Sequence, residues 1–193
     1  MIHLVYKEFC RDDYLTHKLK GLAAWAHVEQ RLRGVSPDTI VIADLAGIEF
    51  MSASFFTAAV LPLWQSENTI NPILVNVNSA ETLFSIEVVL RSERKALWIG
   101  HYEASRVFGL YIIGSLEDTA RQTLQVVLKL KHASTVDLSK YDPKVRQTAW
   151  NNRLTPLYDQ RLLRRVKDGR RFIYSPIWAS PDEDIDNFEV LDG

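Results

Sequence analysis

Apolar and polar positions recur in a regular order along the first hundred residues. Short apolar runs predict strands, and the runs TIVIADL and ILVNV are apolar enough to be buried on both faces. These strands are expected at residues 2–9, 39–45, 73–77 and 96–100. Apolar residues at helical spacing predict helices at residues 14–32, at 52–65 and after Ser79, with Asp12 or Asp13 as the first cap. The βαβαβαβ order predicts an α/β sandwich with a mainly parallel sheet.

A different pattern follows. Residues 106–113 predict a strand that finishes the first sheet or connects it to the next unit, and residues 115–131 predict a helix capped by Ser115 and Asp118. Further on, we expect helices at 136–141 and from the Asp142-Pro143 turn to about 159, then strands at 162–165 and 171–174 around Asp168-Gly169. The expected organisation is an α/β domain at 1–113, an α+β domain at 114–178 and a flexible acidic tail at 179–193.

One segment of the first domain carries a motif, VIADLAGIEFMSASFFTAAVLPLW, from Val41 to Trp64. A strand ends in Asp44, and a short turn, a hydrophobic pair and a small polar loop lead into a helix. This arrangement resembles the STAS domain family, the fold of bacterial anti-sigma factor antagonists, over about residues 1–100. The resemblance implies a phosphorylation or anion loop at Ser52 and Ser54, because unpaired N–H groups at a helix start stabilise a phosphate.

The loop departs from the family pattern at the phosphate acceptor. In phosphorylated members, an Asp-Ser-Ser-Gly-like sequence carries the acceptor at its second position, which is Ala53 here, and Phe55 replaces the glycine. The switch then requires Ser52 or Ser54 as a substitute acceptor. The alternative is that Ser52 is only an N-cap, worth about 1 kcal/mol to the helix, and Ser54 a first-turn residue.

The second domain resembles a winged helix-turn-helix in its element order. Such domains usually place their second helix in the major groove of double-stranded DNA, while the wing contacts the backbone. Arg and Asn side chains read guanine and adenine edges, and Lys and Arg neutralise phosphates. The resemblance implies a DNA-contact set made of Lys144, Arg146, Gln147, Asn151, Arg153, Lys167, Arg170 and Arg171. Core packing is the alternative for Trp150 and Tyr174, and Pro156 is expected to kink or shorten the helix.

Charge is divided unevenly along the chain, although the net charge is only −1. Residues 1–133 hold 13 basic and 14 acidic side chains, residues 134–178 hold 10 and four, and residues 179–193 hold six acidic side chains and no basic one. A clustered basic segment attracts polyanions, and an acidic tail can compete for it. The alternative is that the basic residues form an ordinary solvated face.

Residue types that carry chemistry are sparse. The five histidines show no i, i+4 pair, and the single Cys10 can form neither an internal disulfide nor a thiolate metal site. There is no glycine-rich phosphate loop and no Gly-x-Ser-x-Gly, and Asp44 has no nucleophile and base beside it in the sequence. We expect a protein that is not an enzyme, with no catalytic residue, metal or cofactor.

The apolar run from Phe55 to Trp64 is too short to span a bilayer and contains Pro62, and no signal sequence precedes it. We therefore expect a cytoplasmic protein with no membrane contact. The tail PDEDIDNFEVLDG mixes carboxylates with apolar residues, as segments that order on binding do. It is expected to fold back on the second domain, to dock in another protein, or to remain a solvated tail.

These features predict a bacterial regulatory protein in which a STAS-like sensing or interaction domain is coupled to a DNA-binding winged helix. Its expected partners are double-stranded DNA and a protein bound through the STAS-like face or the tail. A homodimer would match the symmetric half-sites that many winged-helix proteins bind. The alternative is a non-enzymatic interaction scaffold in a multi-protein assembly, with the winged helix making protein contacts.

Overall fold

The computed structural model divides the chain into two compact units. It describes residues 1–65, 70–178 and 188–190. Unit 1 comprises Met1–Ser115 and the C-terminal segment from Asp186, and unit 2 comprises Leu116–Ile185. The division after Ser115 lies two residues beyond the position expected from the sequence.

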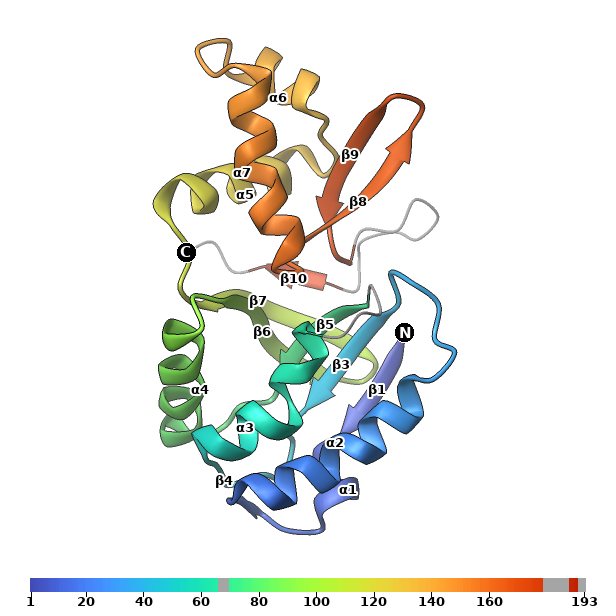
Figure 1. Cartoon of the computed structure of the whole chain (residues 1–193), viewed down its shortest axis with the longest axis vertical. Coiled ribbons are helices and arrows are strands. Elements are labelled where there is room, and N and C mark those ends of the chain that lie inside the picture. The colour runs from blue at the N-terminus through green and yellow to red at the C-terminus, as the bar shows by residue number, and fades with distance from the viewer. Residues whose placement is uncertain (66–69, 179–187, 191–193) are drawn as a thin grey trace. The chain divides into compact units, whose positions relative to one another are not determined.

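Unit 1 is built on a six-stranded sheet in the order β1-β3-β5-β6-β7-β10 (Figure 1). Neighbouring strands run parallel, except for the antiparallel β6–β7 hairpin. The strands are β1 (Ile2–Val5), β3 (Ile40–Asp44), β5 (Asn71–Val75), β6 (Ala96–Glu103), β7 (Arg106–Gly114) and β10 (Phe188–Val190). The predicted mixed α/β architecture with a mainly parallel central sheet is confirmed.

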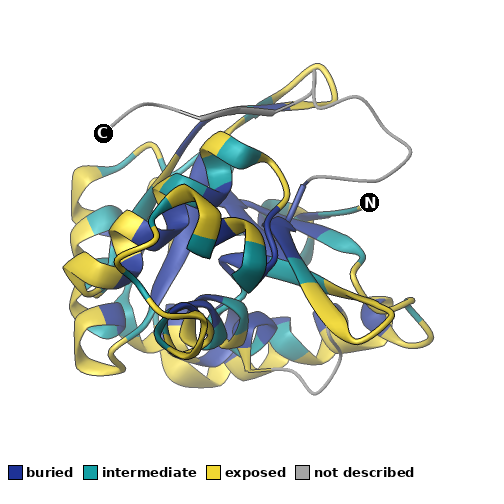
Figure 2. Cartoon of the chain, turned by 90° about the horizontal axis from the view of Figure 1, so that it is seen from above, coloured by how far each residue is buried: buried dark blue, intermediate teal, exposed yellow. Residues whose placement is uncertain are grey.

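Three helices cover one face of this sheet: α2 (Lys18–Leu32), α3 (Ala53–Ala59) and α4 (Ala80–Ser92) (Figure 1). Alternate strand residues such as Leu4, Val41 and Leu97 join helix residues in one hydrophobic core, as a strand period of two requires. Figure 2 shows the same division, with buried residues along the strands and exposed ones on the outer sides of the helices. Each fully buried Leu, Ile, Val or Phe contributes roughly 1.5–3 kcal/mol.

The N-terminal elements differ from the prediction. The strand ends at Val5, because Tyr6–Cys10 forms the short helix α1, and the Tyr6 hydroxyl donates to the Ala59 carbonyl at 2.9 Å. Residues Tyr14–Leu15 form β2, which pairs with β4 (Phe50–Met51), so α2 begins only at Lys18. Asp12 does not cap this helix; its carboxylate accepts from Tyr14 N and Lys20 Nζ instead.

Two later predictions also need correction. The helix expected at residues 52–65 is divided into α3 and a 3-10 helix, η1 (Leu61–Trp64), which contains Pro62. Proline lacks the N–H that a continuing α-helix needs, so it favours this break. The strand expected at residues 73–77 begins and ends two residues earlier, whereas the Ser79 cap is confirmed by its bond from Thr82 N at 3.2 Å.

Over residues 116–178, unit 2 contains three helices followed by an antiparallel hairpin: α5 (Asp118–Leu130), α6 (Thr135–Tyr141), α7 (Gln147–Asp159), β8 (Leu163–Asp168) and β9 (Arg171–Pro176). A single β-bridge joins Ala133, between α5 and α6, to Tyr174. Glu117, not Ser115, occupies the N-cap position of α5 and makes no side-chain cap bond. Helix α7 continues through Pro156 to Asp159, so the expected shortening does not occur.

The core of unit 2 forms between the helices and the hairpin. Trp150 is 4% exposed and Tyr174 is 1% exposed, which confirms the core-packing interpretation of both side chains. With them lie Leu124, Val127, Leu138, Leu154, Leu157 and Leu163, all buried. A capping box at the start of α6 joins Ser134 and Asp137, and the two hydrogen bonds from Ser134 lower the pKa of the Asp137 carboxyl.

Part of the acidic tail belongs to the sheet of unit 1. Strand β10 pairs parallel with β7, with Phe188 opposite Val107 and Val190 opposite Leu110. Residues 179–187 and 191–193 lie outside the described residues, and with them the rest of the predicted tail. In the described ranges, no helix has the length and apolar character needed to cross a membrane.

Candidate functional sites

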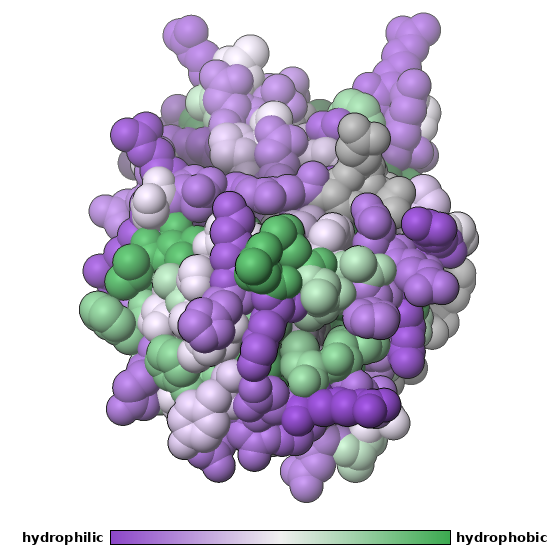
Figure 3. Space-filling view, turned by 60° about the horizontal axis from the view of Figure 1, so that its bottom comes forward, coloured by the Kyte–Doolittle hydropathy of each residue, from purple (hydrophilic) through white to green (hydrophobic). Residues whose placement is uncertain are grey.

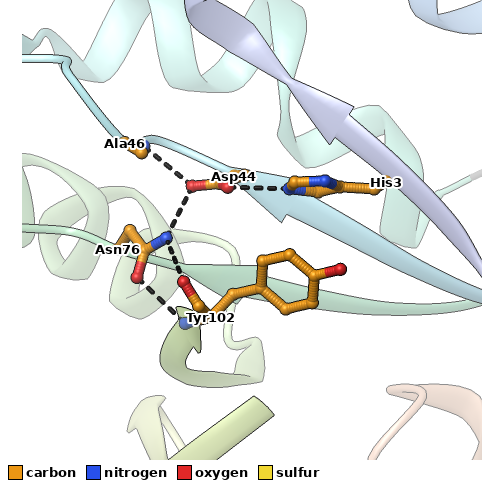
Figure 4. A network of polar contacts seen from close by, with 5 residues as sticks. All are labelled: His3, Asp44, Ala46, Asn76 and Tyr102. Carbon is orange, nitrogen blue, oxygen red and sulfur yellow. Dashed lines mark hydrogen bonds and ion pairs between the residues drawn. The ribbon is translucent and has the colours of Figure 1, made fainter. Parts of the chain in front are cut away.

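A buried carboxylate, Asp44, lies at the carboxyl end of β3 and is 4% exposed. Its neighbours Ala43 and Leu45 belong to the core beneath the helices, so its side chain leaves the opposite face of the sheet. His3 Nε2 lies 2.7 Å from Oδ2 of Asp44, while Ala46 N and Asn76 Nδ2 each donate to Oδ1 at 2.8 Å. Groups from β1, from the turn after β3 and from the residue after β5 thus satisfy one carboxylate (Figure 4).

Asn76 connects this carboxylate to β6. Its amide also donates to the Tyr102 carbonyl at 3.1 Å and accepts from Tyr102 N at 3.0 Å. The Tyr102 ring lies against His3, with ring centroids 4.4 Å apart (Figure 4). Asn76 has a positive φ of 59°, a conformation that asparagine tolerates better than most residues. We name His3, Asp44, Asn76 and Tyr102 the strand-end network.

The sequence prediction missed this network. It treated Asp44 as lacking a base, and the structure supplies His3 from the parallel neighbour β1, 41 residues away. Crevices at the carboxyl ends of parallel strands commonly bind ligands. No nucleophilic side chain joins the network, however, so the described contacts connect strands without assembling a catalytic triad.

The serine loop at the start of α3 has the geometry of a cap. Ser52 Oγ accepts from Phe55 N at 3.3 Å and lies 3.1 Å from Ser54 Oγ. Ser52 is partly exposed and Ser54 is exposed. The structure therefore confirms the N-cap role of Ser52 and keeps both hydroxyls at the surface.

A pocket of about 220 Å³ in unit 1 is lined by residues of α1, β2, α2 and α3. Its wall is mainly apolar, with an ion pair between Asp12 and Lys20 at 3.0 Å. The Lys20 ammonium donates to Asp12 and lowers the pKa of that carboxyl. The lining residues are Phe9, Cys10, Asp12, Leu15, Lys20, Ala23, Ala24, His27 and Phe55.

The pocket keeps Cys10 protonated. Burial, together with the Asp12 carboxylate, raises the pKa of the Cys10 thiol to about 11. With this pKa, well below one per cent of the thiol is ionised at pH 7.5. Reactivity is low as a result, because the thiolate and not the thiol is the nucleophile. Cys10 therefore behaves here as a small apolar side chain.

Slow alkylation of Cys10 is the corresponding expected result. Its rate with iodoacetamide should be far lower than that of the urea-unfolded chain at pH 7.5 and should rise about tenfold per pH unit, with no plateau below pH 9. Mass spectrometry of the modified peptide measures this rate. A native-state rate that levels off near pH 8.5, like that of an unperturbed thiol, would contradict the burial of Cys10.

Exposed apolar side chains occur on the helices of unit 1. Leu19 and Leu22 on α2 are 79% and 47% exposed, and Phe84 and Val88 on α4 are 69% and 47% exposed. In the space-filling view, hydrophobic areas interrupt the hydrophilic surface (Figure 3). Scattered exposed apolar residues are normal, but large side chains on two helices suit a protein contact.

Unit 2 carries the basic segment. Of the predicted DNA contacts, Lys144, Arg146, Gln147, Asn151, Lys167, Arg170 and Arg171 are exposed, and Arg153 is partly buried. In the described part of the chain, none of the basic side chains from 134 to 178 has a carboxylate within 4.0 Å. Two carboxylates of this segment bond backbone groups instead: Asp137 accepts from Ser134 N and Asp142 from Lys144 N. Among the described residues, these positive charges therefore have no carboxylate at ion-pair distance.

Helix α7 has two distinct faces. Trp150, Leu154 and Leu157 are buried on one face, whereas Thr148, Asn151 and Asn152 are exposed on the other. Arg153 lies between the faces, with its guanidinium 5.2 Å from the centre of the Trp150 ring. Arg153 is thus partly buried against Trp150, unlike the other predicted DNA-contact residues, which are exposed.

The hairpin is attached to α7 by an arginine between two aromatic rings. The guanidinium carbon of Arg165 on β8 lies 4.0 Å from the Tyr158 ring centre and 4.7 Å from that of Phe172. Tyr158 belongs to α7 and Phe172 to β9, so one cation connects three elements. Each such contact is worth about 0.5–2 kcal/mol.

Among the described residues, no group of three His, Cys, Asp or Glu side chains is placed to hold a metal ion. The strand-end network, the serine loop, the apolar pocket of unit 1 and the basic surface of unit 2 are thus the candidate sites in the described part of the chain. Comparison with protein-family models, with curated proteins and with solved structures yields no match.

Proposed function

We propose that this chain is a cytoplasmic regulatory DNA-binding protein, in which unit 2 binds double-stranded DNA as a winged helix and unit 1 is a STAS-like sensing or interaction domain. The observation that carries the proposal is the exposed set of cations at the start of α7 and in the hairpin. Lys144, Arg146, Lys167, Arg170 and Arg171 are all exposed. No carboxylate of the described chain lies within 4.0 Å of any of them.

The order of elements in unit 2 supports the winged-helix part. Helix α5, the bridge at Ala133, helices α6 and α7, and the β8–β9 hairpin follow one another as in that fold. In such domains the helix before the hairpin enters the major groove and the hairpin contacts the backbone. Here these two elements are α7 and β8–β9. The exposed Lys144 and Arg146 precede α7, and the exposed Lys167, Arg170 and Arg171 lie in the hairpin.

The STAS-like part has support of a different kind. Strand β3 ends in Asp44, β4 follows after a short turn, and Ser52 caps α3, in the order that the family motif requires. Both serines are at the surface, where a kinase or an anion can reach them. A homodimer on a two-fold symmetric DNA site is the assembly that this proposal favours.

Salt dependence tests DNA binding. If the five exposed cations contact phosphates, log affinity should fall with log salt at a slope of about −4 to −5, from roughly 0.9 per contact. Fluorescence anisotropy with a labelled duplex measures the slope. Lys167→Gln should reduce its magnitude by about 0.9, whereas Lys18→Gln, at an exposed position of α2, should leave it unchanged. Absence of duplex binding at low salt would reject the proposal.

A second candidate function is a protein-interaction scaffold. The exposed Leu19, Leu22, Phe84 and Val88 of unit 1 favour it, as do Val166 and Phe172 on the hairpin, which are 46% and 42% exposed. Binding of a protein that Lys167→Gln leaves unaffected, together with no duplex binding, would support the scaffold over the regulator.

A further inference from the structure

Between residues 148 and 155, the outer face of α7 is uncharged and rich in amides. Thr148, Asn151 and Asn152 are exposed on it and Thr155 is partly buried, opposite the buried Trp150, Leu154 and Leu157, and the exposed Asp159 ends the helix. The span from Thr148 to Thr155 is about 10 Å at 1.5 Å per residue, or about three base-pair steps of 3.4 Å. A face of this length can therefore contact about three consecutive base pairs.

The two asparagine side chains on this face are uncommitted. Neither the Asn151 nor the Asn152 amide has a hydrogen-bond partner in the part of the chain that the structure describes. The Asn151 backbone carbonyl accepts from Thr155 Oγ1 at 2.9 Å, which fixes the Thr155 hydroxyl against the helix. The side-chain amides of Asn151 and Asn152 offer both a donor and an acceptor to a ligand. The Thr155 hydroxyl has no free donor, because it donates to the Asn151 carbonyl.

Cations flank this face without occupying it. Lys144 and Arg146 precede α7, and Lys167, Arg170 and Arg171 lie on the hairpin, whereas the arginine within the helix, Arg153, packs over Trp150. This pattern places phosphate-binding charge at the margins and uncharged hydrogen-bonding groups at the centre. Double-stranded DNA has the complementary pattern, with phosphates on either side of base edges in its major groove.

We infer that α7 selects DNA sites that contain adenine, through bidentate contacts of Asn151 or Asn152 with N6 and N7 of that base. The inference rests on the proposed DNA binding and names its specificity. An asparagine amide donates to N7 and accepts from the N6 amino group, whereas guanine presents two acceptors there and is read by Arg or Lys. Because no free Arg or Lys lies on the central face, a guanine-specific core site is disfavoured.

Selection from a randomised duplex library with the full chain tests the inference. The selected sites should contain adenine within a core of about three base pairs. Replacing that A·T pair by G·C should weaken binding roughly 5- to 150-fold at fixed salt, which is the discrimination expected of one bidentate pair. In Asn151→Ala/Asn152→Ala this ratio should fall close to one.

Matched variants separate base reading from loss of structure or charge. Gln125→Ala removes an exposed amide from α5 and should preserve the ratio. Asn152→Asp keeps the shape of the side chain but presents only acceptors. If Asn152 is the residue that contacts adenine, this variant should lose the discrimination between A·T and G·C. Asn152→Gln keeps donor and acceptor and should retain part of it.

The possible outcomes distinguish adenine selection by α7 from the proposed DNA binding on which it rests. Duplex binding with a guanine-centred site, or with an adenine preference that the double alanine variant keeps, overturns the role of the asparagines and leaves DNA binding in place. Failure to bind any duplex at low salt overturns both.

Discussion

Asp44→Ala is expected to lower the free energy of unfolding of unit 1 by about 3 kcal/mol. The carboxylate accepts from Ala46 N and Asn76 Nδ2 and pairs with His3, in a position that is 4% exposed. Alanine removes all three contacts and leaves a backbone N–H unsatisfied, at about 1–3 kcal/mol for each buried group without a partner. His3 is itself 34% exposed, so water compensates much of its loss.

Urea unfolding, monitored by hydrogen exchange at the β3 and β5 amides, measures the change in stability of unit 1 separately from that of unit 2. Glu29→Ala removes the same charge from an exposed position on α2 and should change stability by less than about 0.5 kcal/mol. Equal stability of the Asp44 and Glu29 variants would show that the strand-end network does not stabilise the sheet.

Gly114→Ala should destabilise unit 1 by about 3 kcal/mol or more. A Cβ at this position would lie 2.3 Å from the Lys95 carbonyl oxygen and 3.0 Å from Leu90 Cβ, and the φ of +97° already disfavours a side chain. The obstructing oxygen belongs to the backbone and accepts from Ser115 N at 2.8 Å, so it cannot move without breaking the β6–β7 connection. Strained backbone costs about 1–3 kcal/mol, and forced overpacking adds about as much.

Gly34→Ala is the matched control for Gly114→Ala. Gly34 also has a positive φ, +76°, but no atom lies within 4 Å of an added Cβ. Only the conformational cost of about 1–2 kcal/mol should appear there. The difference between the two midpoints of urea unfolding measures the clash, and equal midpoints would disprove the close approach at Gly114.

Local pattern predicted most elements, whereas the misplaced start of α2 has a non-local cause. The strand β3 and the capped start of α4 follow directly from an apolar run and from Ser79. The helix expected at residues 14–32 begins only at Lys18, because Tyr14–Leu15 pairs with β4, whose residues lie 36 positions further along. Helical spacing in the sequence carries no information about such a distant strand.

Some features of the candidate sites could likewise be predicted from the sequence, and others could not. Exposure of Lys144, Arg146 and the hairpin cations could be predicted from charge and turn residues, since such side chains rarely enter a core. Packing of Arg153 on Trp150 could not be predicted, because it depends on which helix face is buried. The pairing of His3 with Asp44 depends on β1 lying beside β3.

The sequence by itself determined the type and order of the elements and the separation of a basic segment from a nearly neutral one, because both are properties of neighbouring residues. Only the tertiary structure decided which strands are adjacent, and with that the strand-end network, the pairing of β10 with β7 and the free amides of α7. Strand register and helix packing join residues far apart in the chain, and the core that buries Leu4 with Leu97 selects them.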